Sequence, residues 1–258
     1  MNRFFYFCVL DLMLCLAAVQ AEGQWSSTAS GCEVLDASFR DADRRVSFVL
    51  VRCDPKRVDV RLVDTSSELG RGNPYAAFSL REVMNKVQAS IVVNAGSTAS
   101  YSVPIPAGLL EVRGKIVQRP KLYVKNAAVL CINRDRVGIV TFSSKAPNDC
   151  QDAVQRGPFL SKELSPAGDD SGHYRRTVAA VDGQGRLLIL VTREGATLSS
   201  VVSFLYGSDQ GLGVLSAMNL DGDASSGLIF ARSEGLKESI VGSVDGLVAS
   251  AIAIRKRR

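Results

Sequence analysis

The chain has 258 residues, a formal net charge of +5 and 46% hydrophobic residues. This length is sufficient for a full hydrophobic core without a structural metal ion. Aromatic residues do not alternate with basic ones, so the composition does not support nucleic-acid binding. Part of the positive charge lies in the run from Arg255 to Arg258, which we interpret as a solvated chain end, the alternative being contact with an anionic surface.

Residues 1–21 are predicted to be a cleavable signal peptide. Arg3 supplies a positive charge, residues 4–19 are apolar apart from Asp11, and Val19-Gln20-Ala21 places small residues where a signal peptidase cleaves. The apolar run of about 16 residues is shorter than the roughly 20 that span a bilayer, which favours cleavage over membrane anchoring. No later segment is long and apolar enough to cross a membrane. We therefore expect a secreted or periplasmic protein with no membrane span after cleavage.

Two of the six cysteines leave with the signal peptide, and the others remain: Cys32, Cys53, Cys131 and Cys150. An even number of cysteines in an oxidising compartment predicts two disulfides, for which three connectivities are possible. We prefer Cys32–Cys53 and Cys131–Cys150, because each pair brackets one hairpin-sized segment. No cysteine or histidine spacing predicts a zinc site, and His173 is the single histidine of the chain.

The segment after the signal peptide, residues 22–31, is small and polar, so we predict a flexible linker there. Nothing marks a further boundary, and a single domain is expected over residues 32–258. Within it, alternating apolar residues over 45–63 predict two strands joined by a turn at Asp54-Pro55.

The next elements are a helix and a series of strands. Ser79-Leu80-Arg81-Glu82 is a capping box, which predicts a helix that ends near Lys86. A buried strand follows at 89–93. Later strands are predicted at 109–112, 128–132, 137–142, 178–182, 186–192, 215–220, 227–231 and 247–254, and a second helix near 198–206. Strands dominate, so the expected fold class is α+β, a single domain with a large mixed β-sheet and few helices.

Four short polar segments lie at the ends of predicted apolar strands. They are Asn94-Ala95-Gly96, Gln155-Arg156-Gly157-Pro158, Tyr174-Arg175-Arg176-Thr177 and Asn219-Leu220-Asp221-Gly222. Their glycines allow the backbone to turn and approach a ligand closely. The guanidinium groups of the third segment suit a phosphate or a carboxylate. Each segment alone is common turn chemistry, and the order of all four is the informative feature.

In this order the segments resemble the phosphodiester glycosidase family, over roughly residues 80–230. The family motifs are matched by Asn94 to Gly96, Pro106 to Leu109, Gln155 to Pro158, Arg176-Thr177 and Asn219 to Gly222. The resemblance implies the fold of that family and the hydrolysis of sugars linked through phosphate. The partner expected is therefore a glycan or a sugar phosphate.

Two departures from the family pattern bear on function. Ser97-Thr98 stands where the family has aromatic residues, and Asp223 stands where it has a second glycine. These departures keep open an alternative, a non-catalytic carbohydrate-binding or cell-envelope protein that retains the fold. A third interpretation is a surface-interaction protein that uses the basic run. The sequence does not indicate an oligomeric state.

The resemblance and the chemistry of a glycosyl phosphodiester assign roles to these residues. Asp221 supports positive charge at the anomeric carbon, although a nucleophile, a base or a cation ligand fits the same residue. Arg176 holds the phosphate, and Asn219 completes the predicted catalytic set. The residues predicted to bind substrate are Asn94, Gly96, Gln155, Gly157, Thr177 and Gly222.

Metal and histidine chemistry receive little support from the sequence. Asp221 and Asp223 offer oxygen ligands of the kind that Ca²⁺ binds, but too few others are visible to predict a calcium site. We therefore predict no cofactor and no metal ligand. His173 lies beside the third segment and is interpreted as a solvated bystander.

Overall fold

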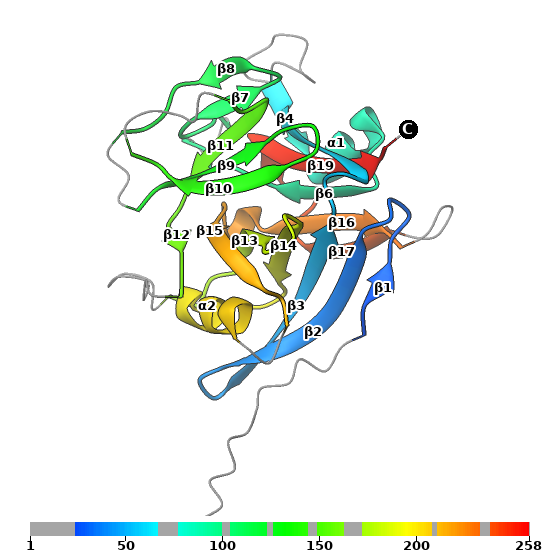
Figure 1. The fold of residues 1–258 in the computed structure, drawn as a ribbon, viewed down its shortest axis with the longest axis vertical. Coiled ribbons are helices and arrows are strands. Elements are labelled where there is room, and N and C mark those ends of the chain that lie inside the picture. Colours follow the sequence, from blue (N-terminus) through cyan, green and yellow to red (C-terminus); the bar gives the residue numbers. More distant parts are fainter. Residues whose placement is uncertain are drawn as a thin grey trace, which may run out of the picture.

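The computed structural model describes residues 24–66, 77–99, 104–122, 126–143, 149–162, 172–207, 211–232 and 238–257. In these stretches strands predominate, and the two α-helices found there pack on outer faces of the sheets (Figure 1). The predicted signal peptide falls outside the described residues. None of the described helices has both the length and the apolar character that crossing a membrane requires.

A seven-stranded antiparallel sheet forms one layer, in the order β1-β2-β3-β14-β13-β15-β12. Its strands are β1 (Ser26–Ser27), β2 (Glu33–Asp41), β3 (Arg44–Cys53), β14 (Leu187–Thr192), β13 (Thr177–Asp182), β15 (Val214–Asn219) and β12 (Phe159–Leu160). One face contributes to the central core, and the other packs against α2 (Leu198–Tyr206). The middle strands β13 and β14 are therefore buried along their whole length.

A five-stranded antiparallel sheet combines distant parts of the chain, in the order β17-β16-β6-β19-β4. Its strands are β17 (Glu238–Gly242), β16 (Gly227–Ala231), β6 (Ile91–Asn94), β19 (Ser250–Lys256) and β4 (Val58–Asp64). Its outer face packs against α1 (Leu80–Val87). Although β3 and β4 follow each other in sequence, they belong to different sheets, so the turn after Cys53 leads from one layer to the next.

A second five-stranded antiparallel sheet has the order β10-β9-β11-β7-β8. Its strands are β10 (Val137–Thr141), β9 (Ala128–Ile132), β11 (Asp152–Arg156), β7 (Leu110–Val112) and β8 (Lys115–Gln118). A short pair, β18 (Leu247–Val248) with β5 (Phe78–Ser79), stands beside α1.

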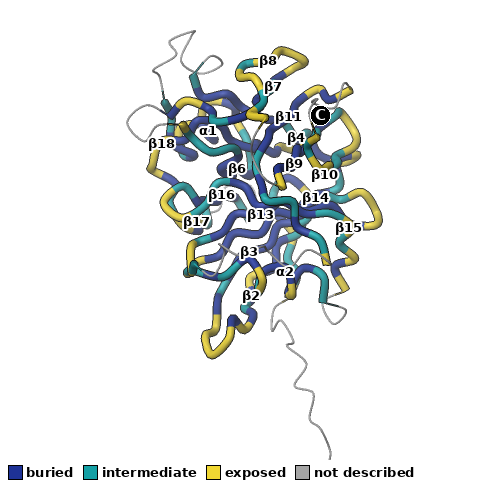
Figure 2. Tube along the Cα trace, turned by 90° about the vertical axis from the view of Figure 1, so that its left-hand side faces the viewer, coloured by how far each residue is buried: buried dark blue, intermediate teal, exposed yellow. Residues whose placement is uncertain are grey.

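The main hydrophobic core lies between the three larger sheets, because each of them turns alternate apolar residues inward. Its largest fully buried members include Leu62, Ile91, Leu110, Leu130, Leu187 and Phe230. In Figure 2 the buried residues run through the middle of the molecule, and the exposed ones gather at the turns. Burial of one such side chain contributes about 1.5–3 kcal/mol. This core fixes the relative positions of the strand ends that carry the polar segments.

The capping box predicted for the first helix is confirmed. The Ser79 hydroxyl accepts a hydrogen bond from the Glu82 amide at 3.3 Å, and the Glu82 carboxylate accepts one from the Ser79 amide at 2.8 Å. The second helix, also confirmed, begins after the N-cap residue Thr197. Asp41, at the end of β2, accepts hydrogen bonds from the Thr197 amide and from the hydroxyl groups of Thr197 and Ser200.

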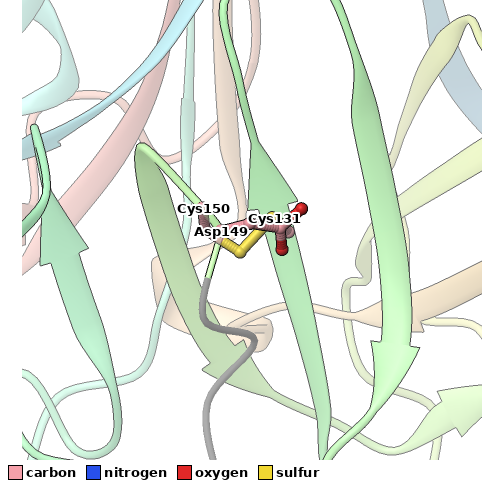
Figure 3. Close-up of side chains that lie close together, drawn as sticks. All are labelled: Cys131, Asp149 and Cys150. Carbon is pink, nitrogen blue, oxygen red and sulfur yellow. A yellow bond between two sulfur atoms is a disulfide. The ribbon is translucent and has the colours of Figure 1, made fainter.

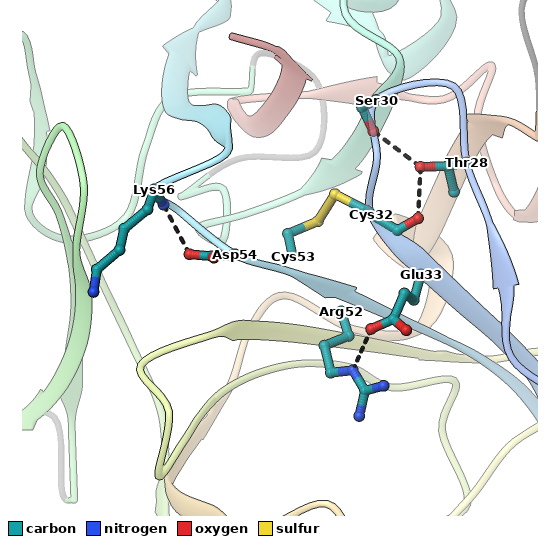
Figure 4. The surroundings of a disulfide bond; sticks show 8 residues. All are labelled: Thr28, Ser30, Cys32, Glu33, Arg52, Cys53, Asp54 and Lys56. Atoms are coloured by element: carbon teal, nitrogen blue, oxygen red, sulfur yellow. Dashed lines mark hydrogen bonds and ion pairs between the residues drawn. A yellow bond between two sulfur atoms is a disulfide. The ribbon is translucent and has the colours of Figure 1, made fainter.

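Both disulfides have the connectivity preferred from the sequence. Cys32–Cys53 joins the start of β2 to the end of β3, beside the ion pair of Glu33 with Arg52 (Figure 4). Cys131–Cys150 joins β9 to the residues just before β11, and the Asp149 side chain lies next to it (Figure 3). Each bridge therefore closes one pair of neighbouring strands.

The sheets differ from the expected arrangement in one respect. The α+β class with few helices is as predicted, but the described strands pair antiparallel and are divided among separate sheets, rather than forming one large mixed sheet. The connections account for this result, because short Gly- and Asp-containing turns such as Asp182-Gly183 join antiparallel neighbours, whereas parallel neighbours need long crossovers.

The expected linker also needs correction. From residue 24 onward it belongs to the folded domain, since Ser26 and Ser27 form β1 and pair with β2. The Thr28 hydroxyl donates a buried hydrogen bond of 3.1 Å to the Cys32 carbonyl, and the Arg52 guanidinium lies 4.0 Å from the centre of the Trp25 ring. Small polar residues are thus used here for buried hydrogen bonds, which composition does not distinguish from a mobile linker.

Candidate functional site

A polar cavity of about 440 Å³ opens where β6, β11 and β15 end. Its described lining consists of Ser97, Thr98, Ala99, Ala107, Lys121, Arg156, Asp221, Gly222, Asp223, Ala224 and Ser225. One wall is fixed by backbone hydrogen bonds, from the Ala99 amide to the Ile105 carbonyl and from the Ala107 amide to the Ser97 carbonyl. Its volume is within the range of small-ligand pockets. This space is the candidate active site, and we call it the catalytic cavity on that basis.

Asp221 and Arg156 form an ion pair in the catalytic cavity, with 3.3 Å between Arg156 Nη2 and Asp221 Oδ1. Burial raises the pKa of Asp221 above its ordinary value, although a hydrogen bond from Ser225 and the charge of Arg156 act in the opposite direction. The Arg156 Nε is buried and has no hydrogen-bond partner among the described residues. The cavity therefore presents the Asp221 carboxylate beside the Arg156 guanidinium. The described residues leave one donor of that guanidinium, Nε, without an acceptor.

Asn94 holds the backbone of Asp221. Its Nδ2 donates to the Asp221 carbonyl at 2.7 Å, and the Asp221 amide donates to the carbonyl of Ala95 at 3.0 Å. The Asn94 Oδ1 accepts hydrogen bonds from the Thr177 hydroxyl at 2.9 Å and from the Gly227 amide at 3.1 Å. Asn94 is fully buried and outside the cavity lining, so it positions the Asp221 turn from behind and is not placed to orient sugar hydroxyls.

Thr177 belongs to the same buried network. Its hydroxyl lies 3.2 Å from the Ser226 hydroxyl, which in turn donates to the Arg175 carbonyl at 3.1 Å. The Asp223 amide also donates to the Arg175 carbonyl, at 2.8 Å. The network thus joins the start of β13 to both sides of the Asp221 turn, and Thr177 supports the cavity without lining it.

Gln155 acts as a clamp between two loops. Its Oε1 accepts hydrogen bonds from the amides of Leu109 and Lys121, at 3.1 and 2.8 Å, and its Nε2 donates to the Lys121 carbonyl at 2.8 Å. A Cβ at Gly108 would approach this Oε1 to 3.1 Å, which explains the glycine there. Gln155 is buried and does not line the cavity, so the predicted contact with sugar is not found. Its side chain instead holds Lys121 at the cavity wall.

Gly96 and Gly157 are needed for close packing around the cavity. A Cβ at Gly96 would come within 2.9 Å of the Val154 side chain, and one at Gly157 within 2.9 Å of the Asn126 carbonyl. Neither glycine lines the cavity, whereas Gly222 does. Of the residues predicted to bind substrate, the described lining therefore contains Gly222, and the others support it.

Arg176 is placed differently from the expectation that it holds a phosphate. Its Nε donates to the Ala196 carbonyl at 2.9 Å and its Nη2 to the Gly172 carbonyl at 2.8 Å, so the guanidinium is buried against the loop before α2. Adjacent residues of a strand point to opposite faces. Because Thr177 points toward Asn94, Arg176 points away from it and does not line the cavity.

Asn219 and His173 are also outside the cavity lining. The backbone amide of Asn219 donates to the Pro158 carbonyl at 3.0 Å. The side-chain Oδ1 of Asn219 is buried and has no hydrogen-bond partner among the described residues. His173 is partly exposed, with its Nε2 3.6 Å from the Asp41 carboxylate. The structure thus groups His173 with the start of α2 rather than with Asp221.

Two charged residues of the cavity lining were missed from the sequence, Arg156 and Lys121. Arg156 stands inside the recognised Gln-x-Gly-Pro segment, at the position between the matched residues. Strand alternation gives the missing signal: Val154 faces the main core, so Arg156 shares its side of β11 while Gln155 takes the other. Lys121 has no local signal, because the side chain of Gln155 sets its position.

The two departures from the family pattern both line the cavity. Ser97 and Thr98 form one wall, and Asp223 adds a second carboxylate beside Asp221. Asp223 has a φ of 52°, in the left-handed region that favours glycine. Among the described residues, one group of three potential metal ligands occurs, Cys131, Asp149 and Cys150, and both of its cysteines are in a disulfide.

Comparisons with known proteins relate this geometry to other chains. Residues 87–255 match the family model described as phosphodiester glycosidase. The chain resembles the zebrafish N-acetylglucosamine-1-phosphodiester alpha-N-acetylglucosaminidase catalytic domain auto-inhibited by pro-peptide, with a TM-score of 0.66 and 16% identity over 93% of this chain and 89% of that one. No curated protein sequence matches it.

Two further structures share the fold. A hypothetical protein from Synechocystis aligns with a TM-score of 0.62 and 14% identity, over 92% of this chain and 64% of that one. A Burkholderia pseudomallei protein described as exported aligns with a TM-score of 0.56 and 13% identity, over 82% of this chain and 74% of that one. The family match spans well over half of the sequence and includes the Asn94, Gln155, Thr177 and Asp221 segments, so this chain belongs to the phosphodiester glycosidase family.

Proposed function

We propose that this protein is an exported hydrolase that cleaves phosphate-linked sugars from glycans or envelope polymers, with Asp221 as its catalytic carboxylate. The observation that carries the proposal is the Asp221–Arg156 pair in the catalytic cavity, 3.3 Å apart. Family membership supports the class of substrate, a glycosyl phosphodiester.

The reaction breaks the bond between the anomeric carbon and the phosphate oxygen. The electron pair of that bond stays on the phosphate, water supplies the new oxygen on the sugar, and the proton lost by water passes to solvent. Phosphate is a good leaving group, so the site needs charge stabilisation more than acid assistance. Asp221 stabilises the positive charge on the sugar, while Arg156 and Lys121 bind the phosphate.

In this mechanism Arg156 takes the role first expected of Arg176. Arg156 lines the cavity and carries an Nε without a partner among the described residues. The guanidinium of Arg176 instead donates to two backbone carbonyls beside α2. Guanidinium groups recognise phosphate through paired hydrogen bonds, so the placement of Arg156 favours it.

The test measures sugar released from a panel of glycosyl phosphodiesters. The wild type should release sugar and leave a phosphomonoester. Asp221→Asn should lower kcat about 10²–10⁴-fold, and Arg156→Gln should lower kcat/KM about 10²-fold or more. Arg176→Gln serves as the matched control, with lower stability and an unchanged KM. A wild type that releases no sugar from any member of the panel would contradict the proposal.

The alternative is a carbohydrate-binding protein that keeps the fold without turnover, favoured by Asp223, Ser97 and Thr98 in the cavity wall. Binding of an unreactive sugar phosphate to Asp221→Asn separates the two. In an enzyme, this variant binds the ligand and loses turnover. In a binder, wild type and variant differ in affinity and neither releases sugar.

Export and domain limits are part of the proposal. The two disulfides fit an oxidising compartment, and cleavage after residue 21 would leave β1, the first described strand, in the mature protein. Sequencing of the secreted protein should begin at Glu22, and an intact start in a cytoplasmic protein would contradict export. The mechanism uses no cofactor, so exhaustive chelation should leave turnover unchanged.

A further inference from the structure

We propose that a second site, the arginine groove, binds the phosphate groups of a polyanionic chain. The groove has a volume of about 300 Å³, and its described lining is Asp59, Val60, Arg61, Arg113, Ile132, Arg134, Gln151, Asp152 and Arg255. Four arginines converge there from four separate parts of the chain. Guanidinium groups bind phosphate oxygens through paired hydrogen bonds, so their convergence points to an oxyanion.

The arginine groove is separate from the catalytic cavity. Asp152 lines the groove and Arg156 lines the cavity, and they are the first and last residues of β11. Four residues of extended strand span about 13 Å. The same division holds on the neighbouring sheet, where Ala251 of β19 is opposite Asn94 and Arg255 is opposite Asp59. A ligand in one site therefore leaves the other accessible.

The carboxylates of the groove are engaged with protein groups. The buried Asp152 accepts hydrogen bonds from the amides of Leu62 and Arg113, at 2.8 and 2.7 Å, and so ties β4 and the β7–β8 turn to β11. Asp59 pairs with Arg255 through a contact of 2.7 Å. Four guanidinium groups thus face two carboxylates, and the positive charge exceeds the negative charge of the lining.

Arg113 occupies an unusual position for its residue type. It and Gly114 form the two-residue β7–β8 turn with φ values of 55° and 73°. Turns of this kind favour Asn-Gly, because both central residues need positive φ. A residue kept in an unfavourable conformation is a pointer to function when its side chain serves a site. The turn is fixed by the Gly114 amide, which donates to the Gln151 carbonyl at 2.7 Å.

The basic run at 255–257 is built into this face of the molecule. The Arg257 guanidinium donates to the carbonyls of Pro55, Lys56 and Arg134, so Arg257 is held against the fold, whereas Arg255 and Lys256 are exposed. A second hollow of about 380 Å³, lined by Gln88, Ser90, Arg255, Lys256 and Arg257, shares Arg255 with the groove. Positive charge therefore continues past Arg255, as a chain with several phosphates requires.

The shape of the groove favours a phosphate polymer over a membrane surface. Its apolar lining residues, Val60 and Ile132, are buried and offer no surface for insertion into lipid. A concave site with guanidinium groups on several walls surrounds a single oxyanion, and a flat bilayer cannot enter it. Binding at this site does not depend on turnover; only the identity of the natural polymer, a phosphate-linked glycan, rests on the proposed function.

The test uses fluorescently labelled linear inorganic polyphosphate as the probe and measures anisotropy at two salt concentrations. The double variant Arg134→Gln/Arg255→Gln should bind at least about tenfold more weakly, with a smaller dependence on salt. Arg40→Gln/Arg44→Gln is the matched control, because it removes the same charge from exposed positions of the β2–β3 hairpin. Its affinity should change less than about twofold.

Further arms separate this site from the cavity and from folding. Asp221→Asn should bind polyphosphate as the wild type does, and Arg156→Gln, which removes a phosphate contact of the cavity, should lose less affinity than the double variant. Arg134→Gln alone changes one exposed turn residue, so its weaker binding at an unchanged Tm excludes misfolding as the cause. Equal losses in the groove and control variants, a loss confined to Arg156→Gln, or binding to anionic vesicles without binding to polyphosphate would each overturn the proposal.

Discussion

The side-chain amide of Asn94 donates a hydrogen bond of 2.7 Å to the backbone carbonyl of Asp221, 127 residues further along the chain. The Asn94 Oδ1 accepts hydrogen bonds from the Thr177 hydroxyl and the Gly227 amide. One buried side chain therefore joins the end of β6, the start of β13, the start of β16 and the turn that carries the candidate carboxylate. The motif residues that are distant in sequence are connected through the interior, behind the cavity.

Replacing Asn94 should reveal this connection. Asn94→Ala leaves two buried donors and one buried acceptor unpaired, each costing about 1–3 kcal/mol. The free energy of unfolding, measured in urea, should fall by several kcal/mol, and turnover should fall with it. Asn85→Ala, an exposed position on α1, is the control and should change stability by less than about 0.5 kcal/mol. Equal stability of the two variants would contradict the role of Asn94.

The raised pKa of Asp221 predicts that the contribution of this residue to stability falls as the pH rises. A carboxyl group with a higher pKa in the folded state binds more protons there, so it favours folding below the unfolded-state pKa of about 3.9. That contribution is lost as the pH rises through the folded pKa. Asp221→Asn does not titrate and should be more stable than the wild type at pH 7, by a margin that shrinks toward pH 3.5. Thermal unfolding across this range measures it, and a margin that grows on acidification would exclude this account.

Asp41 should behave in the opposite way. Burial raises its pKa, but hydrogen bonds from Ser200 and Thr197 and the nearby His173 outweigh this effect and bring the pKa below its ordinary value. Its stabilisation is present above the unfolded-state pKa and is lost as the pH falls through the folded pKa. Asp41→Ala should cost about 1–2 kcal/mol at pH 7 through the loss of hydrogen bonds at the start of α2. Asp43→Ala, exposed in the same hairpin, is the control, and a loss that persisted unchanged at pH 2 would count against this origin.

Asp223 permits a separation of backbone strain from charge. Asp223→Gly relieves a φ of 52° and should stabilise the fold by up to about 1 kcal/mol. Asp223→Asn removes the charge and tolerates the same conformation, so its stability should stay near that of the wild type. If the carboxylate repels a substrate phosphate, both variants should lower KM to a similar extent. A lower KM in the glycine variant alone would assign the effect to the backbone.

The regular elements were largely predictable from local signals. The capping box at Ser79 and Glu82 and the apolar alternation of β3 and β4 depend on neighbours in sequence, and both predictions are confirmed. β2 was missed, although Leu35, Ala37 and Phe39 alternate with polar residues as an amphipathic strand requires. Which sheet a strand joins is decided by distant partners, so the separate antiparallel sheets were not foreseen.

The candidate site was predictable as a set of segments and less so as a set of side chains. Asp221 and Gly222 line the cavity, whereas Asn94, Gln155 and Thr177 act from behind it. A motif names residues that must stay together, and it does not state which of them face the ligand. Whether Arg156 and Arg176 face the cavity depends on the alternation of side chains between the two faces of a strand. A shift of one residue at the strand end moves the side chain to the other face.

The position of β19 between β4 and β6 has a consequence for the order in which the molecule can be completed. A ribosome or translocon delivers β4, β6, β16 and β17 before residues 250–256 emerge. Until then β4 and the free side of β6, the strand that ends at Asn94, present open edges that can pair with other chains. This strand contributes Arg255 to the arginine groove, and its Ser250 accepts hydrogen bonds from the amides of Ala95 and Gly96 beside the cavity. Both sites are therefore finished by the last strand of the sheet to be synthesised.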